Sequence, residues 1–447
     1  MDNLSASIRN LFLNTNTNAH GIAYGRKIVS GQLTDDLAIT YFVEKKLPID
    51  QLNDNNVIPT TLSIDGITYY TDVVEQGRIE PLLCNALNSA SCVTLQSHNR
   101  PLSGGMEISN TASYGPNVSS AGFVFFYGTL GMIAVDNTDG NLVGVTNAHV
   151  AVKDAILTSD RNPNGVLESI IDNNDFYYNT GALPYEYLGT YPPGILQNGS
   201  YNMTHGSNNL DFIFNNRIGV TKRYQPLTTG SNYVNTIDCA IIQLDSGAGI
   251  IDSTSAQQAF INGTYAMPFA NSGEISSVTG NIPLYSVGRT SGPKWTGCPM
   301  SGSYIHITAS AGYPFQDGVA KIYLSDIVQF SFIDQSSGVT IGGDSGSVIM
   351  GNFNGVNKVV GLVWGGGTGS FNGQTTYHGV FSRIDNIANE MNISAWDGGT
   401  LKFGTTDPAE INKVYTSPYY TGTTITISGI KYYQAGLQSV SNPTLVA

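Results

Sequence analysis

The sequence predicts a mainly β fold, and three observations lead to this. Short apolar runs alternate with turn clusters along most of the chain after residue 120, at the spacing of strands rather than of helices. Many of the turns are rich in glycine, of which the chain holds 51 among 447 residues. Only 12% of the residues are charged, which suits short strands and polar turns better than long solvent-facing helices. Together these features indicate barrels or sandwiches.

Residues 1–95 are predicted to form a small α+β N-terminal domain that ends in a linker. GIAYGRKIV and LAITYFVEKKL have the composition of strands, and Pro48 stands where a short helix could start. The extended runs on either side of Asp65 and Gly66 predict a hairpin, because this dipeptide favours a tight turn. The Ser-, Asn- and Gly-rich stretch that begins near residue 85 indicates linker and loop.

Residues 96–395 form the second predicted domain, and residues 396–447 a β-rich C-terminal extension. The interval 155–235 is polar and rich in Asn and Tyr, and it predicts an insertion of large loops. SRIDNIANEM, after Phe381, is the one good helix candidate of this domain. TTITISGIKYYQAGL predicts a hairpin in the extension.

Composition also limits the kinds of partner that the protein is expected to have. The net charge of −13 without a basic block argues against nucleic acid, and the apolar runs are too short for a membrane-spanning helix. The N-terminal residues lack the pattern of a secretory signal, so we expect a cytoplasmic protein, or part of a particle assembled there, with reduced cysteines. The six scattered histidines lack metal-ligand spacing, so neither a metal nor another cofactor is expected. The low charge and many tyrosines also fit a homo-oligomer or larger assembly. The cysteines are Cys84, Cys92, Cys239 and Cys298.

The stretch TIGGDSGSVIM, residues 340–350, places Ser345 in a glycine-rich turn before an apolar strand. A serine hydroxyl is a weak nucleophile, and it needs a base to take its proton and an acid to orient that base. The candidates are His149, which ends the apolar strand in GVTNAHVAV, and Asp238, which opens the strand in NTIDCAIIQL. The N–H groups of Gly343 and Ser345 would then form an oxyanion hole.

Each of these residues also has a plainer interpretation: Ser345 in a structural turn, His149 as a core histidine, Asp238 as a strand-opening cap. What favours catalysis is the joint pattern, because the chain order His, Asp, Ser is one of the orders known for this triad. The intervals between the three residues leave room for several strands. Asp211 and Asp245 are weaker candidates for the acid, because neither stands at the opening of its strand.

From about residue 100 to 395 the chain resembles chymotrypsin-like (trypsin-fold) serine peptidases, nearest to non-exported bacterial and plant members. The resemblance is carried, in order, by GTLGMIAVD, TNAHV, IDCAII, VGRTSG, GGDSGSVIM and VVGLVWGGGTG. AITYFVEKKLP and DGITYYTDVVE resemble the small domain that precedes the peptidase in that group. The first 20 residues or so, the polar insertion and the extension lie outside the match.

The resemblance implies two six-stranded antiparallel β-barrels and a protein or peptide substrate. By position, His149 would be the general base and then acid, Asp238 would orient it, and Ser345 would attack the scissile carbonyl. The arginine of the VGRTSG motif implies an ion pair between Arg289 and Asp344, which would brace the oxyanion turn. A buried carboxylate beside that turn needs such a partner.

The resemblance also places a specificity pocket beside the serine. Its floor falls on Val339, and its wall on Val363, Trp364 and Gly366. Without an acid at the floor, it implies an uncharged residue at P1, on the acyl side of the scissile bond. Trp364 either narrows this pocket or belongs to the core.

Two departures from secreted members fit a non-oxidising compartment: Val150 stands beside the histidine where they have cysteine, and Tyr285 replaces the partner of Cys298. GRKIVSG imitates a zymogen cleavage site, but Ile28 falls inside an expected strand of the small domain, so we interpret it as a decoy. The leading hypothesis is a serine endopeptidase. The alternatives are a structural or assembly component (particle or virion type) on a peptidase fold, active or degenerate, and a peptide-binding module.

Overall fold

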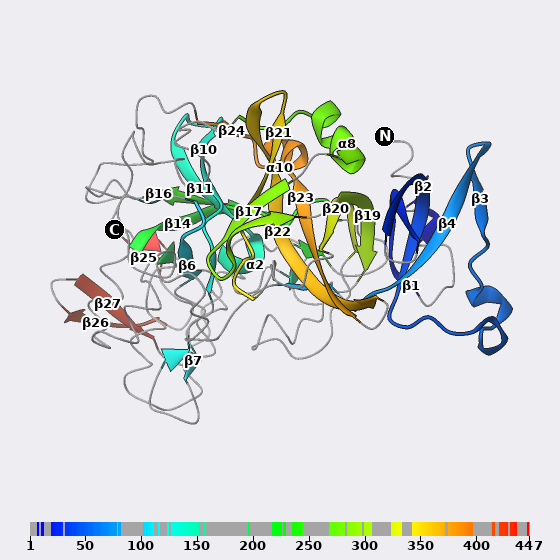
Figure 1. The fold of residues 1–447 in the computed structure, drawn as a ribbon. Coiled ribbons are helices and arrows are strands. Elements are labelled where there is room, and N and C mark those ends of the chain that lie inside the picture. Colours follow the sequence, from blue (N-terminus) through cyan, green and yellow to red (C-terminus); the bar gives the residue numbers. More distant parts are fainter. Residues whose placement is uncertain are drawn as a thin grey trace.

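The protein is mainly β with few helices in the computed structural model (Figure 1). The structure describes residues 7–8, 10–12, 19–29, 32–77, 79–81, 102, 104–110, 115–116, 123–124, 127–151, 156–157, 195–196, 217–225, 227–228, 235–244, 268–281, 284–296, 299–305, 323–332, 342–371, 374–396, 414–415, 420–427, 430–435 and 445–446.

The larger sheet has twelve strands in the order β18-β17-β21-β22-β23-β20-β19-β1-β2-β4-β3, and β5 pairs with β22 beside this path. It joins the N-terminal strands to the half of the chain that carries Ser345. The strands are β1 (Ala19–Val29), β2 (Gln32–Val43), β3 (Thr61–Ile64), β4 (Ile67–Glu75), β5 (Glu80–Pro81), β17 (Leu284–Gly288), β18 (Gly292–Thr296), β19 (Pro299–Ile305), β20 (Tyr323–Phe332), β21 (Val348–Phe353), β22 (Val356–Phe371) and β23 (Gln374–Arg383).

The N-terminal strands β1–β4 lie at one end of this sheet (Figure 1). β3 and β4 form the expected hairpin, which is confirmed: Asp65 and Gly66 have φ of 50° and 80°, the left-handed values that a tight turn requires. Pro48 precedes a single 3₁₀ turn, η1 (Ile49–Gln51), and η2 (Asp54–Asn56) follows. Since β1 pairs with both β2 and β19, the sheet runs unbroken past the predicted domain boundary, and that division stays a prediction.

The second sheet has eight strands in the order β24-β10-β11-β16-β14-β13-β6-β9. It carries the ends of the segments that hold His149 and Asp238. The strands are β6 (Glu107–Asn110), β9 (Tyr127–Thr129), β10 (Met132–Asp136), β11 (Leu142–Thr146), β13 (Ile195–Leu196), β14 (Arg217–Tyr224), β16 (Ala240–Leu244) and β24 (Ile393–Ala395).

Four two-stranded pairs complete the described sheets. The hairpin expected in the extension is confirmed by the pairing of β26 with β27. In Figure 1 it lies at the opposite end of the molecule from β1–β4. The pairs are β7 (Gly115–Pro116) with β8 (Phe123–Val124), β12 (Ile156–Leu157) with β15 (Leu227–Thr228), β25 (Val414–Tyr415) with β28 (Leu445–Val446), and β26 (Tyr420–Ile427) with β27 (Ile430–Ala435).

The two six-stranded barrels stay a prediction, because neither sheet closes into a ring among the residues that the structure describes. One strand lies inside the interval 155–235 that was predicted as large loops. β14 pairs with both β13 and β16, so this part of the interval belongs to the sheet. Its sequence, RIGVTKRY, carries three charged residues in eight, and the pairing on both sides rather than apolar composition holds it extended.

The helices are short: α2 (Ala148–Ala151), α8 (Ser272–Asn281) and α10 (Ile384–Glu390). α10 confirms the helix expected after Phe381. α8 was missed, although its sequence carries a start signal. Asn271 and Glu274 form a reciprocal capping box, in which each side chain accepts the other's backbone N–H at 2.9 and 3.0 Å.

A large apolar core joins the two sheets. Met132 and Val145 from the second sheet belong to the same buried cluster as Val348, Leu362 and Phe381 from the first. Burial of such side chains contributes about 1.5–3 kcal/mol each, so this shared core fixes how the two sheets sit together. It thereby fixes the positions of the chain segments at their ends, where the candidate site lies.

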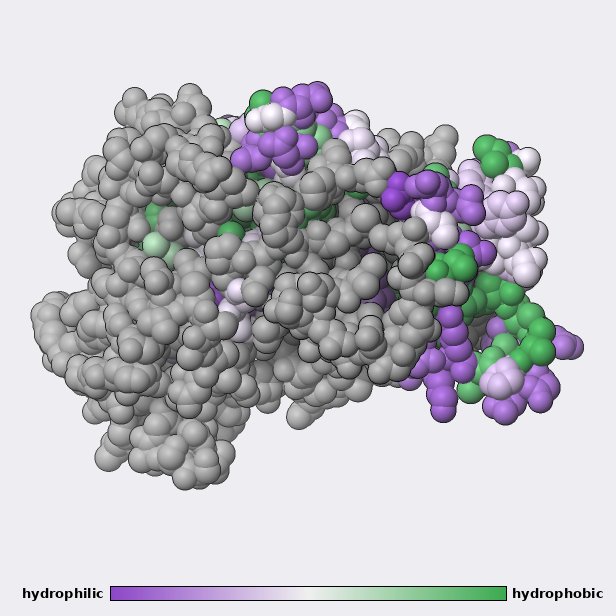
Figure 2. All heavy atoms as spheres, viewed as in Figure 1, coloured by the Kyte–Doolittle hydropathy of each residue, from purple (hydrophilic) through white to green (hydrophobic). Residues whose placement is uncertain are grey.

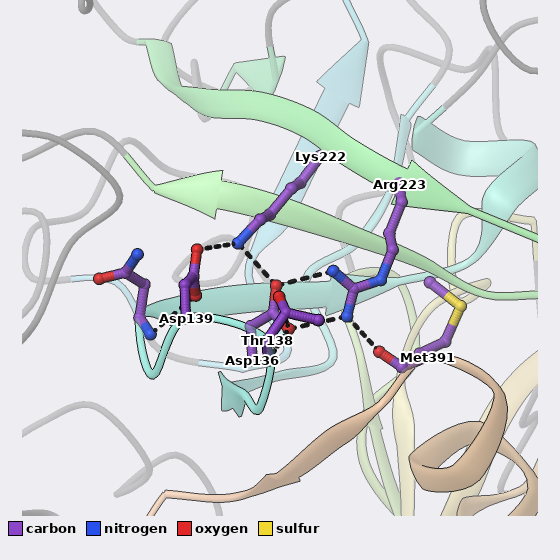
Figure 3. A network of polar contacts seen from close by, with 7 residues as sticks. Asp136, Thr138, Asp139, Lys222, Arg223 and Met391 are labelled. Atoms are coloured by element: carbon purple, nitrogen blue, oxygen red, sulfur yellow. Dashed lines mark hydrogen bonds and ion pairs between the residues drawn. The ribbon is translucent and has the colours of Figure 1, made fainter.

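A polar network ties the second sheet to the segment after α10 (Figure 3). Asp136, at the end of β10, accepts two bonds from Arg223 of β14 at 2.7 and 2.8 Å, and Lys222 lies 2.6 Å from the same carboxylate. Arg223 also donates to the carbonyl of Met391. This fixes the end of α10 against β10 and β14, which are separate strands of the second sheet.

Exposed apolar side chains gather on the N-terminal strands, where green surface lies at the right of the view in Figure 2. Within the described residues, no helix is both long and apolar enough to cross a membrane. The exposed large apolar residues of this region are Val29, Leu37, Leu47, Ile49, Ile67 and Tyr70.

Candidate active site

The register of two neighbouring strands brings His149 and Asp238 together. β11 and β16 are antiparallel, with Thr146 opposite Ala240. His149 follows the end of β11 and Asp238 precedes the start of β16, so both residues lie at the same end of the strand pair. The chain after β11 folds into the single turn of α2, which carries the imidazole.

Asp238 contacts His149 through both of its carboxylate oxygens. Oδ2 pairs with Nδ1 of the imidazole, and Oδ1 accepts the backbone N–H of His149 at 3.2 Å. Asn147 donates to the Asp238 carbonyl at 2.7 Å, and the Asp238 N–H donates to Ser382 Oγ at 3.1 Å. Because both side chains are buried, this arrangement holds the imidazole in one orientation and leaves Nε2 at its far side.

Ser345 lies in a tight turn of the other sheet, directly before β21. Gly343 and Gly346 flank it with φ of 100° and 92°, values that L side chains rarely adopt. At Gly343 a β-carbon would also lie 2.5 Å from Thr290 Oγ1, and at Gly346 one would lie 2.1 Å from the Thr129 carbonyl. Gly343 and Gly346 are therefore required by the backbone conformation and by close packing.

β9 holds this turn next to the histidine segment. The Thr129 N–H donates to the Ser345 carbonyl at 2.8 Å, and Thr129 Oγ1 donates to the Gly343 carbonyl at 2.8 Å. A β-carbon on Gly128 would lie 2.5 Å from Val150 and 3.1 Å from the Ser345 carbonyl. One glycine therefore separates the neighbour of His149 from the serine backbone.

The Ser345 hydroxyl donates to the carbonyl of Trp364 at 3.0 Å. This carbonyl belongs to β22, the strand that the resemblance assigns to the wall of the specificity pocket. In this rotamer the hydroxyl is directed to the wall strand. A rotation about one side-chain bond is the motion that would redirect it.

Asp344 and Arg289 lie on either side of the same turn, with contacts that sequence reasoning did not foresee. Asp344 Oδ1 accepts the backbone N–H groups of Thr290 and Ser291, each at 3.0 Å. The Arg289 guanidinium forms an ion pair with Glu107, and both side chains are about 1% exposed. The predicted Arg289–Asp344 ion pair stays a prediction.

Glu107 is thus a residue of the site that sequence reasoning missed. It opens β6 inside GGMEISN, a stretch interpreted as linker and loop, and nothing in that stretch signals a buried acid. Its partner Arg289 also lies over the ring of Tyr127, with Cζ 5.1 Å from the ring centroid. The Arg289 N–H donates to Thr129 Oγ1 at 3.1 Å, which ties this ion pair to the strand that holds Ser345.

The structure describes three of the four residues predicted to form the specificity pocket. Val363 is fully buried, and Gly366 is buried. Trp364 is 1% exposed and its side chain packs in a core cluster with Phe42, Ile79 and Val380, which fits the core alternative rather than a pocket lining. The proposed floor, Val339, lies outside the described residues.

Cys239, next to Asp238, is a buried free thiol. Burial is the main cause that raises its pKa well above the ordinary value, and the carboxylates of Asp238 and Glu390 add to it. The thiol is therefore neutral and inert at neutral pH. The other three cysteines lie outside the described residues.

Comparison with known proteins gives only distant likenesses. No protein-family model matches the chain, and no curated protein matches it. Among solved structures, a glutamic-acid-specific serine protease with a histidine triad in substrate binding is 13% identical, over 66% of this chain and all of its own, with a TM-score of 0.31.

Two further solved structures are similar at the same level. Thermobifida fusca protease A is 12% identical over 66% of this chain and 98% of its own, with a TM-score of 0.28. Cellulomonas bogoriensis chymotrypsin is 12% identical over 66% of this chain and 99% of its own, with a TM-score of 0.27.

Proposed function

We propose that this chain is a serine endopeptidase that hydrolyses peptide bonds through Ser345, His149 and Asp238. One observation carries the proposal. A buried aspartate holds an imidazole through Nδ1, and a serine on a glycine-flanked turn is fastened by β9 to the segment next to that imidazole. The chain order and burial of these groups, and the orientation of the imidazole, are what nucleophilic catalysis by serine requires.

In the proposed reaction the Ser345 hydroxyl rotates from the Trp364 carbonyl towards His149. Nε2 accepts its proton as Oγ attacks the scissile carbonyl carbon. The resulting imidazolium, stabilised by Asp238, then donates that proton to the leaving amine. In the second half of the reaction His149 accepts a proton from water as the water attacks the acyl carbon. The imidazolium then donates that proton to Ser345 Oγ as the acyl group leaves, which regenerates the free hydroxyl.

The negative charge that develops on the carbonyl oxygen needs donors that are already in place. We assign this task to the backbone N–H groups of Gly343 and Ser345, on a turn whose carbonyls are held by Thr129 and Thr290. A turn fixed from several directions costs little reorganisation when charge appears. Such donors contribute about 2.7–4 kcal/mol each in the transition state.

The proposal includes two barrels of the chymotrypsin type, one around β10, β11, β14 and β16 and the other around β17 and β20–β23. It also includes an uncharged P1 residue, because no acid stands at the position assigned to the pocket floor. The packing of Trp364 in the core supports a pocket that its ring does not narrow.

Labelling with a fluorophosphonate probe tests this function directly. We expect the wild-type chain to be labelled and Ser345→Ala to be unlabelled, with hydrolysis of a peptide library lowered by a factor on the order of 10⁶. Ser394→Ala, at a serine of β24 that bonds Asn137 and takes no part in this turn, is the control and should still be labelled. A folded wild-type chain that neither reacts with the probe nor cleaves any library peptide would exclude the peptidase.

A further inference from the structure

A short segment of the N-terminal region pairs with the strand that follows the nucleophile. β5 runs antiparallel to β22, with Pro81 opposite Gly365 and Glu80 opposite Gly366. These two glycines come directly after Trp364, whose carbonyl accepts the hydroxyl of Ser345. β5 therefore lies on the wall strand, immediately beyond the serine.

The edge of β22 is filled by three different partners along its length. β21 pairs with it up to Leu362. Val363 is then bonded to the nucleophile turn, since its carbonyl accepts the Gly346 N–H and its N–H donates to the Ser347 carbonyl, each at 2.8 Å. Past that point the edge is open to a further strand, and β5 takes the place.

An exposed strand edge of this kind is where an extended peptide binds, by adding a strand through main-chain hydrogen bonds. The direction of β5 shows which way the segment runs relative to Ser345. As the chain advances from Glu80 to Pro81, its partner on β22 moves from Gly366 back to Gly365, towards Trp364 and Val363. The segment therefore runs towards Ser345.

Side chains before β5 anchor the segment in place. Ile79 is 2% exposed and packs in the same buried cluster as Trp364. Gln76 is fully buried, its N–H donates to the Val43 carbonyl at 2.9 Å, and its side-chain oxygen accepts a bond from Gln329 at 2.8 Å. The segment is thus held at its start by the bond between Gln76 and β2, and at its end by the pairing of β5 with β22.

We propose that β5, anchored through Ile79 and Gln76, is a built-in occupant of the peptide-binding edge of β22, so that the chain holds its own site closed until this segment leaves. The inference rests on the proposed peptidase function, because that function makes the edge of β22 the place where a substrate peptide binds. Release is sterically simple, because β5 has two residues and proline supplies no N–H to the pairing. Displacement of the segment, by a partner or by a cut behind it, would then open the edge to substrate.

Binding of a peptide tests occupancy without requiring turnover. A fluorescein-labelled QGRIEPL peptide, which copies residues 76–82, is titrated by fluorescence polarisation into Ser345→Ala chains. We expect at least ten-fold tighter binding when Ile79→Ala loosens the internal segment, because the peptide's own isoleucine then refills the vacated site. Ile64→Ala, the same change in a separate cluster of the N-terminal strands, should bind like the parent.

Labelling of the corresponding Ser345 chains separates the inference from the proposed function. Faster fluorophosphonate labelling of Ile79→Ala than of the parent and of Ile64→Ala supports both. Tighter peptide binding with no labelling in any chain would keep self-occupancy and overturn the peptidase. Equal labelling and equal peptide binding in all chains would overturn the inference and keep the peptidase. If Ile79→Ala fails to fold, Gln76→Ala releases the other anchor and is judged by the same outcomes.

Discussion

Glu107 and Arg289 form a buried ion pair that contacts the turn of Ser345. Arg289 lies against Gly343, where a β-carbon would sit 2.9 Å from the guanidinium. Two charges of opposite sign buried together can be close to neutral for stability, but one of them alone is strongly unfavourable. The pair therefore acts as a unit, and through Arg289 it supports the turn that holds Ser345.

Glu107→Gln removes the negative charge and keeps the shape of the side chain. We expect a loss of about 3–5 kcal/mol in the free energy of unfolding, because the Arg289 charge is left uncompensated in the interior. Urea denaturation followed by tryptophan fluorescence measures this.

The double variant Glu107→Gln/Arg289→Met is the control, since it removes both charges. It should recover most of the lost stability. With the single variant Arg289→Met to complete the cycle, the difference between the loss in the double variant and the sum of the two single losses is the coupling energy of the pair. Additive losses in the double variant would mean that Glu107 and Arg289 do not act together.

At the scale of single residues, sequence reasoning found the candidate site residues that stand in a recognisable local motif. His149, Asp238 and Ser345 each stand in a short segment with a recognisable apolar flank, and the structure places all three segments close together. Glu107 carries no such signal. It reaches Arg289 because β6 pairs with β9 opposite Thr129, a non-local register that no local pattern contains.

Between elements, the network around Asp136 fastens β10, β14 and the end of α10 (Figure 3). Burial alone would raise the pKa of the Asp136 carboxyl, but the hydrogen bonds from Arg223, Lys222 and Thr138 outweigh it and hold that pKa well below its ordinary value. A lowered folded-state pKa means that the stabilisation is present above the unfolded pKa of about 3.9 and is lost as the pH falls further.

Asp136→Asn should therefore be costly at neutral pH and less costly in acid. We expect a loss of about 2 kcal/mol at pH 7, the range for hydrogen bonds to charged groups, and a smaller difference from wild type at pH 3. Urea midpoints at the two pH values measure it. Asp139→Asn, an exposed partner of Lys222, should cost less than about 1 kcal/mol. A penalty for Asp136→Asn that is equal at both pH values would rule out the charge as its cause.

The two elements that sequence reasoning missed, β14 and α8, each have a composition that disfavours the structure they adopt. β14 carries three charged residues in eight and is held as a strand by neighbours on both sides, so its extended state is set by pairing rather than by composition. α8 contains glycine, serine and threonine, which are weak helix formers, and its capping box with burial of Ile275 and Val278 compensates. The β3–β4 hairpin was predictable because Asp65 and Gly66 decide its turn locally.

On the scale of the whole molecule, the first sheet joins the N-terminal strands to the half of the chain that carries Ser345. Two histidines are buried there, His20 on β1 and His378 on β23. Burial, with added repulsion from His20, lowers the pKa of His378 to about 4. In the unfolded chain the same group titrates near its ordinary value of about 6.5.

This difference makes stability depend on pH in a defined window. Below about pH 6.5 the unfolded chain gains a proton on His378 that the folded chain does not take up until about pH 4. Stability is therefore lost as the pH falls from 6.5 to 4, by about 3 kcal/mol for the full shift. Acid within this range should loosen the region of the sheet around β1 and β23.

His378→Phe removes the titrating group and keeps a flat ring in the same place. We expect the variant to lose about 2–3 kcal/mol less than wild type between pH 7.0 and pH 4.5, because only the wild-type unfolded chain gains this proton. Urea midpoints at the two pH values, compared within each protein, cancel any constant cost of the larger ring. The carboxylates titrate alike in both proteins, so parallel curves would show that His378 does not set the acid sensitivity. A flatter curve for His378→Phe would instead assign it to this buried histidine, where the N-terminal strands meet the rest of the sheet.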